Sequence, residues 1–154
     1  MSTPVPLPIT WSPRRNRLVL LPLSAAMVVL FTVMAFVLPA NWHLNDRVAM
    51  VVSGLLFAGV GLMLARPRVT ADEEGVTVVN FVRTRRLAWA EVVRVNLRAG
   101  DPWVILDLAD GTALAAVGIQ PAGGRVQAIQ AARTLRDLVD ERAVPQDGST
   151  TAQG

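Results

Sequence analysis

The stretch LAWAEVVRV, residues 87–95, decides the fold of the C-terminal half of this chain. Leu87 and Trp89 fall on one side of an extended strand, and Glu91 follows a turn. Beyond this corner apolar and polar residues alternate, which is typical of a half-buried antiparallel strand. We therefore expect Trp89 to fill the space between sheet layers and Glu91 to accept backbone N–H groups where the chain reverses. The alternative is that Trp89 contacts a ligand.

Short strands extend in both directions from this corner. Asp110-Gly111 gives the strongest hairpin signal of the chain. In the strand after the corner, Val93, Val95 and Leu97 should share one face, and either Val92 or Val93 should re-enter the core. The predicted strands, six or seven in all, include RVTA (68–71), VTVVNF (76–81), VVRVNLR (92–98), WVILDLA (103–109) and TALAAVGI (112–119).

One amphipathic helix should follow the strands over residues 125–143. Its apolar stripe consists of Val126, Ile129, Ala132, Leu135, Leu138 and Val139. Strands with one apolar face must close or stack to bury it, and a final helix can cover the open end. The prediction is an antiparallel β-barrel or sandwich capped by one C-terminal helix. The polar tail 144–154 is expected to be disordered.

Two uncharged apolar runs precede the strands. Residues 18–38 form a run of 21 and residues 48–65 a run of 18. As helices they would reach about 31 Å and 27 Å, which matches the hydrocarbon core of a bilayer. The short loop between them permits only an antiparallel arrangement. We predict a transmembrane helical hairpin over residues 18–66.

Small residues recur along the second run. Gly54, Ala58 and Gly61 would lie on one face of the helix, where another helix can approach closely. The first run is the natural neighbour. The alternative is that glycine is simply common in membrane helices.

Arginines flank the two runs unevenly. Three precede the first run, Arg66 and Arg68 follow the second, and the loop between them holds Arg47 alone. Since cytoplasmic flanks carry the excess of arginine, we expect a multi-pass protein of the inner membrane with both termini in the cytoplasm. The segment 1–17 is then cytoplasmic, and Trp11 would lie at the membrane interface. The first run is longer than the apolar region of a signal peptide, about 7–15 residues.

The composition argues against several classes of site. With no cysteine and one histidine, we expect no disulfide and no metal site. Up to residue 68 six arginines face one acid, whereas from residue 69 nine arginines face eleven acids, so the C-terminal half lacks the basic footprint of a nucleic-acid binder. The apolar runs contain no ionisable residue, which argues against a transport path. No nucleophile–base pair stands out, so we expect neither an enzyme nor a cofactor.

The C-terminal pattern resembles a known fold. Short strands, the Trp89–Ala90–Glu91–Val92 corner, the LADGT hairpin and a single final helix resemble the pleckstrin-homology (PH) fold. With two leading membrane helices, the chain is similar to small bacterial PH-domain proteins, including those called low-molecular-weight protein antigens. The resemblance implies an α+β membrane protein with a PH-like domain over residues 67–143.

Three functions remain open from the sequence. The favoured one is a membrane-anchored, non-enzymatic interaction module that binds a protein partner, a second copy of the chain included. The second is a lipid-headgroup sensor that uses Arg83, Arg85 and Arg86, because guanidinium groups suit phosphate. The third is an accessory subunit of a membrane complex, packed on larger partners through its small-residue helix face.

A glycine pair, Gly123-Gly124, precedes the final helix. Glycines before a helix occur in phosphate-binding loops, but the phosphate loop also needs a lysine, and the chain has none. We interpret the pair as a hinge or helix entry.

Overall fold

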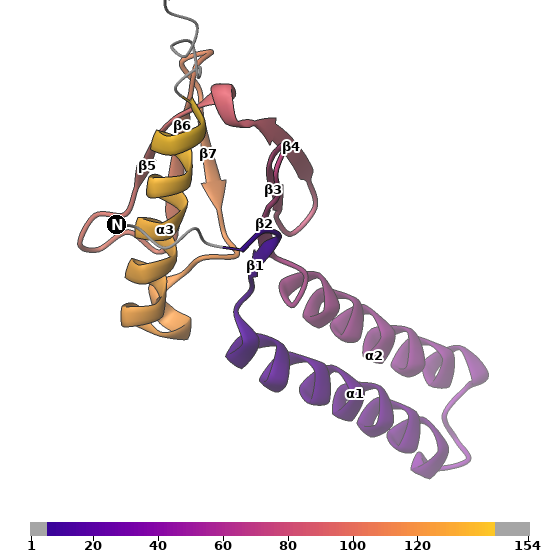
Figure 1. The fold of residues 1–154 in the computed structure, drawn as a ribbon. Coiled ribbons are helices and arrows are strands. Elements are labelled where there is room, and N and C mark those ends of the chain that lie inside the picture. The colour runs from indigo at the N-terminus through magenta and orange to yellow at the C-terminus, as the bar shows by residue number, and fades with distance from the viewer. Residues whose placement is uncertain (1–5, 144–154) are drawn as a thin grey trace, which may run out of the picture.

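The computed structural model describes residues 6–143, and the predicted disordered tail lies outside them. Two apolar helices, α1 (Arg14–Val37) and α2 (Leu44–Leu64), lead into two antiparallel sheets and a C-terminal helix, α3 (Arg125–Ala143) (Figure 1). This order of elements is the predicted one, except for the short strand that precedes α1. The two helices project together from one side of the sheet domain.

An arginine closes the far end of the helical hairpin. The guanidinium of Arg47, in the first turn of α2, donates to the carbonyl oxygens of Ala35 at 2.8 Å and Leu38 at 2.9 Å. The last carbonyls of a helix have no partner within it, so Arg47 satisfies those of α1. The one basic residue between the two apolar runs of the sequence therefore serves as a helix cap for α1.

The first sheet contains a strand that the sequence did not predict. Its order is β1 (Ile9–Trp11), β2 (Arg68–Ala71), β3 (Gly75–Val79) and β4 (Thr84–Ala88). Trp11 lies opposite Val69 and packs against the domain core, a contact that the sequence did not predict. Strand β1 has three residues, which is too short to show periodicity. Its partner β2 follows α2, so the sequence gives no local signal for the pair.

The second sheet has the order β5 (Val92–Asn96), β6 (Val104–Leu108), β7 (Ala113–Ala116). The β6–β7 hairpin turns at Asp110-Gly111 as predicted, with φ of +80° at Gly111, where glycine is favoured. The prediction that Val93 shares a face with Val95 is wrong. A bulge between Val92 and Arg94 shifts the register, so Val92 is buried whereas Val93 is 61% exposed.

A closed barrel is not formed. The short helix η1 (Trp89–Glu91) connects the sheets on one side, and on the other side the side chain of Asn80 bridges them. Its Nδ2 donates to Ala115 O at 2.7 Å, and its Oδ1 accepts from Val117 N at 3.2 Å. A side-chain amide thus replaces the backbone ladder that would close a barrel.

Helix α3 covers the core between the sheets, where Leu87, Leu106 and Leu135 are fully buried. The predicted stripe fails at its first residue, since Val126 is 66% exposed. The buried face is instead lined in its first half by three alanines, which allow the helix to lie close to the sheets: Ala128, Ala131 and Ala132.

Strand direction sorts the turns into two ends of the domain. Strand β2 leaves α2 through Arg66 and Pro67, and β3 returns, with Arg68 opposite Val79. The β3–β4 turn, residues 80–83, therefore lies at the end where the helices attach, and the β2–β3 turn lies at the far end (Figure 1).

Candidate functional site

The corner at Trp89 joins three parts of the domain. The indole is 6% exposed, and its Nε1 donates to the carbonyl oxygens of Asp72 and Glu73, each at 3.2 Å. Arg142 of α3 lies 5.9 Å from the ring centroid and also donates to Glu73 O. The ring therefore holds the β2–β3 turn and the end of α3 together.

Glu91 stabilises the same corner through two further hydrogen bonds. Its Oε2 accepts the backbone N–H of Ala88 at 2.7 Å, and its backbone carbonyl accepts from Ala109 N at 2.9 Å. The corner thus connects to the β6–β7 turn. Every polar contact of Trp89 and Glu91 is internal to the domain, which suits a structural role.

The arginines of β4 do not form one cluster. Arg86 pairs with Glu74 at 2.6 Å and with Asp72 at 3.3 Å, at the end of the domain far from the helices. Arg85 points to the opposite face of the strand and lies 3.5 Å from Asp110. Both guanidinium groups already have carboxylate partners.

Arg83 differs from these two. It is exposed, makes no ion pair within residues 6–143, and belongs to the β3–β4 turn at the helix end of the domain. Its neighbour Val82 is 74% exposed. Of the three predicted lipid-contact arginines, Arg83 is the one with the placement that such a contact requires.

The carboxylate of Asp110 has an altered titration. The Thr112 hydroxyl donates to it at 2.6 Å and the Thr112 backbone N–H at 2.8 Å. These bonds, followed by nearby Arg85, favour the ionised form and lower the pKa of Asp110 from 3.8. The two hydrogen bonds from Thr112 stabilise the hairpin turn, and we assign Asp110 no catalytic role.

A groove of about 350 Å³ runs between β5 and α3. The exposed Val93 lies at this groove together with Arg136 and Asp140. Arg136 donates to the carbonyl of Val95 at 2.8 Å and so caps part of the strand edge. The bulge and this cap hinder addition of another strand, but they leave side chains available for contact.

The small-residue face of α2 is occupied by α1. A Cβ placed on Gly54 would lie 2.8 Å from Phe31 Cβ, and one on Gly61 would collide with the Ser24 hydroxyl. Ala58 is buried between them. A larger membrane partner would have to use other faces of the helices.

Metal or catalytic centres are not found in the described part of the chain. No group of three or more His, Cys, Asp or Glu side chains could hold a metal ion between residues 6 and 143. His43 lies at the far end of the helical hairpin, where its backbone N–H donates to Asp46 at 3.0 Å.

Comparison with known families agrees with this geometry. Residues 66–138 match the family model described as a bacterial PH domain. This part of the chain is similar to bacterial PH domains. Strand β1 lies outside the matched residues, so the sheet that begins in them also contains a strand from before the helical hairpin.

Relatives of the chain are mycobacterial. Uncharacterized proteins of Mycobacterium bovis and of two Mycobacterium tuberculosis strains are each 37% identical to it over 94 residues. The alignment covers 61% of this chain and 60% of each relative. No solved structure matches the chain.

Sequence reasoning missed Asn80 and Arg136. Both make hydrogen bonds to backbone groups 35 to 41 residues away, and periodicity carries no information on such pairs. A polar residue inside a strand pattern, as in VVNF, is the one available signal for Asn80.

Proposed function

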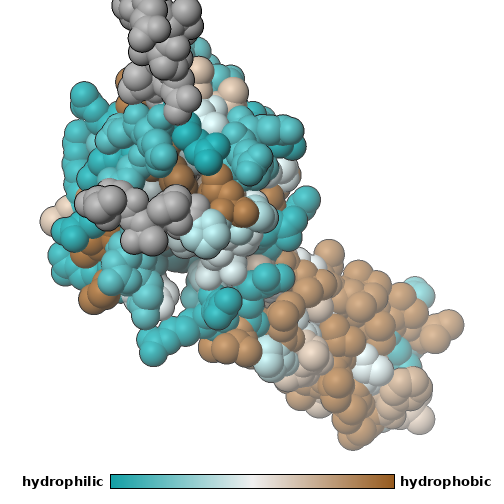
Figure 2. All heavy atoms as spheres, in the orientation of Figure 1, coloured by the Kyte–Doolittle hydropathy of each residue, from teal (hydrophilic) through white to brown (hydrophobic). Residues whose placement is uncertain are grey.

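We propose that this protein is a membrane-anchored, non-enzymatic interaction module, whose helical hairpin inserts in the inner membrane and presents the PH domain to a protein partner in the cytoplasm. The observation that carries the proposal is the exposure of the two helices. Both are long and apolar enough to span a bilayer, and only 11% of either apolar window is buried. Figure 2 shows this brown surface against a largely hydrophilic domain.

The exposed side chains of the helices are large and apolar. Phe36 is 79% exposed and Leu56 66%, whereas the buried residues of these helices are small. Contiguous apolar surface of this extent is rare on soluble proteins and marks a membrane or protein contact. Large apolar side chains that face outward and small residues between the two helices are typical of a helical hairpin in a membrane.

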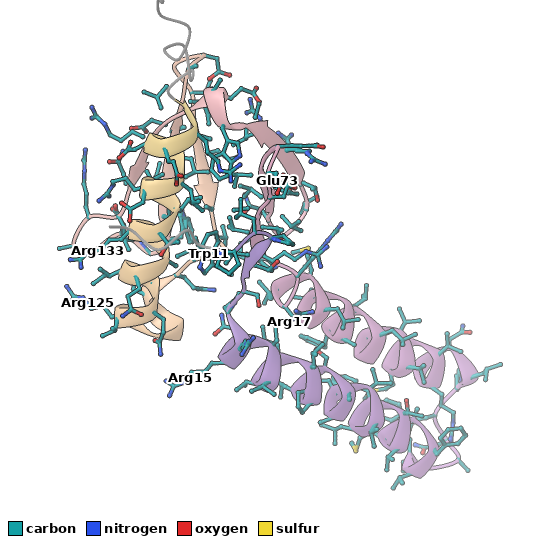
Figure 3. The ribbon with its side chains drawn as sticks, viewed as in Figure 1. Trp11, Arg15, Arg17, Glu73, Arg125 and Arg133 are labelled. Atoms are coloured by element: carbon teal, nitrogen blue, oxygen red, sulfur yellow. The ribbon has the colours of Figure 1, made fainter. Side chains whose placement is uncertain are left out.

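The distribution of the arginines favours a cytoplasmic placement of both termini. Arg15 and Arg17 at the start of α1 lie at the domain end of the hairpin (Figure 3), as do Arg66 and Arg68 after α2. Arg47 at the opposite end is bound to carbonyl groups of α1. The positive-inside rule therefore favours the PH domain on the cytoplasmic side.

A protein partner is best accommodated at the β5–α3 groove. Strand β5, which borders the groove, lies on the side of the domain away from α1 and α2 (Figure 1), so in the proposed arrangement the membrane does not cover it. Its exposed Val93 offers an apolar anchor, flanked by Arg94 and Arg136. Because Asp140 also borders the groove, we expect the partner to contribute an apolar side chain with charged groups of both signs beside it.

Alkaline carbonate extraction and proteolysis test the anchoring. The full chain should remain in the membrane pellet after carbonate washing. A protease added outside intact cells should leave the PH domain whole, and a protease added to inverted vesicles should remove it. Release by carbonate would refute insertion, and cleavage of the domain in intact cells would refute the orientation.

Photo-crosslinking tests the partner. A photoreactive residue at Val93 should capture a discrete protein in native membranes, whereas the same residue at Val126, equally apolar and 66% exposed, should not. Capture at both positions, or at neither, would contradict the groove assignment. Purification of the chain alone, with bound lipid that is lost on Arg83→Gln, would favour the lipid-sensor alternative.

A further inference from the structure

A cavity of about 400 Å³ lies where the helical hairpin meets the PH domain. One wall is the segment from Thr10 to the first turn of α1, and the other runs from Gly118 to the first turns of α3. The two walls approach each other at Pro13, whose Cβ lies 4.0 Å from the position that a Cβ added to Gly123 would take. The cavity is therefore built from segments far apart in the sequence.

The charge lining this cavity has one sign. Arg14 and Arg15 border it, and none of its lining residues is acidic. Uncharged hydrogen-bonding groups come from Ser12, Gln120 and Gln127. Such a set of donors suits a phosphate group.

The helix starts around the cavity add to this preference. Helix α1 begins with Arg14 and Arg15, without an acidic residue in its first turn and without a side-chain cap on its free N–H groups. Helix α3 begins after Gly124, also without an acidic residue in its first turn. Cations at a helix N-terminus oppose the helix dipole, and an anion bound between them would relieve that repulsion.

The position of the cavity identifies the source of the anion. Arg14 and Arg15 begin the helix that enters the bilayer in the proposed function, so the cavity opens at the level of the headgroups. In Figure 3, Arg15 and Arg125, at the starts of α1 and α3, both lie at the lower edge of the domain. Soluble phosphate would have to compete there with a dense layer of lipid phosphates.

We infer that this junction cavity binds the phosphate of an anionic phospholipid headgroup, held by Arg14 and Arg15 against the first turn of α3. The glycine pair 123–124 then has a purpose beyond helix entry, because it lets the chain pass close to the headgroup. The bound lipid would fix the PH domain relative to the membrane. This inference rests on the proposed insertion of the hairpin.

The test uses the full chain in detergent, with phosphatidylglycerol or phosphatidylcholine added and bound lipid counted by native mass spectrometry. The wild-type chain should retain phosphatidylglycerol preferentially. The variant Arg14→Gln/Arg15→Gln should bind it about 25-fold more weakly, at roughly fivefold for each arginine near a membrane surface. The charge-matched control Arg94→Gln/Arg133→Gln, outside the cavity, should bind as the wild type does.

A third variant separates binding from folding. Gln127→Glu puts a carboxylate in the cavity with little change of shape, and a negative charge in the first turn of α3 stabilises that helix. Its melting temperature without lipid should not fall, whereas its retention of phosphatidylglycerol should fall several-fold. Full retention by Gln127→Glu would overturn the assignment.

Other outcomes also decide against the cavity. Equal retention of the two lipids by the wild type, or equal loss in the control variant, would reduce the effect to general surface charge. Displacement of the bound phosphatidylglycerol by inorganic phosphate would identify a soluble ligand instead. Carbonate extraction of each variant distinguishes membrane insertion from lipid binding by the cavity. A chain that stays inserted but shows no lipid preference refutes only the lipid site.

Discussion

The hydroxyl oxygens of Thr10 and Thr70 lie 3.1 Å apart across the β1–β2 ladder, although 60 residues separate them in the chain. Between them lies the entire helical hairpin. The pairing brings the start of α1 and the end of α2 into one sheet, so the hairpin and the PH domain are joined by two strands rather than by one flexible linker. A fragment that begins at residue 69 would lack β1.

Trp11 should therefore stabilise the PH domain even though it precedes the first helix. Trp11→Ala is expected to lower the free energy of unfolding of the domain by about 2–3 kcal/mol, somewhat less than for a fully buried tryptophan. Trp42→Ala, at the opposite end of the hairpin and 41% exposed, is the control and should leave it unchanged. Hydrogen exchange of the domain amides in the full chain measures both. Equal effects would contradict the placement of Trp11.

Substitutions of Trp89 should separate packing from hydrogen bonding. Trp89→Ala is expected to cost about 3–5 kcal/mol, because it empties a core position. Trp89→Phe keeps much of the packing but removes the indole donor to two carbonyls, so it should cost about 1–2 kcal/mol. Denaturation followed by circular dichroism gives both values. A phenylalanine variant as unstable as the alanine variant would show that the hydrogen bonds dominate.

Asn80 should contribute more than an ordinary surface asparagine. Asn80→Ala leaves Ala115 O and Val117 N without their partner between the sheets, and should cost about 1–3 kcal/mol. Asn96→Ala removes a bond to the Asp107 side chain at the edge of the second sheet, and should cost about 1 kcal/mol or less. A chemical denaturation curve for each variant checks the order. The reverse order would mean that the sheets are held together elsewhere.

Glycines of α2 should differ in their tolerance of size. Gly61→Leu places a side chain against Ser24 and should destabilise the hairpin by about 1–3 kcal/mol through overpacking. At Gly59 a Cβ would meet no atom within 4 Å, so Gly59→Leu adds apolar surface toward lipid without a clash. Thermal unfolding in detergent micelles compares the two. If Gly59→Leu were the more damaging change, another helix must cover that face.

The titration of Asp110 should respond more to Thr112 than to Arg85. The folded-state pKa lies below 3.8, so the stabilising contribution of the carboxylate is present above that pH and is lost as the pH falls through the lowered pKa. Thr112→Val should move the pKa back toward 3.8, and Arg85→Gln should move it less. Carboxyl chemical shifts in an NMR titration report both. A larger shift for Arg85→Gln would reverse the assigned order of causes.

The elements with strong local signals were predictable from the sequence. The two apolar helices, the strands after residue 68, the Asp110-Gly111 hairpin and α3 all follow from residue periodicity or turn chemistry. These signals arise because hydrogen bonding and burial of one face repeat every two or 3.6 residues. Five of the seven strands described here were found in this way, and of β4 only its end at Leu87 and Ala88.

Tertiary structure alone decided how these elements combine. The β5 bulge turned Val93 outward, and Asn80 joined two sheets that do not close into a barrel. Arg85 and Arg86 form ion pairs with carboxylates. The sequence by itself determined which segments are apolar and which are strands, because those properties are local. The partners of a side chain depend on segments that meet only after folding, so the junction cavity and the β1–β2 ladder could come from the structure alone.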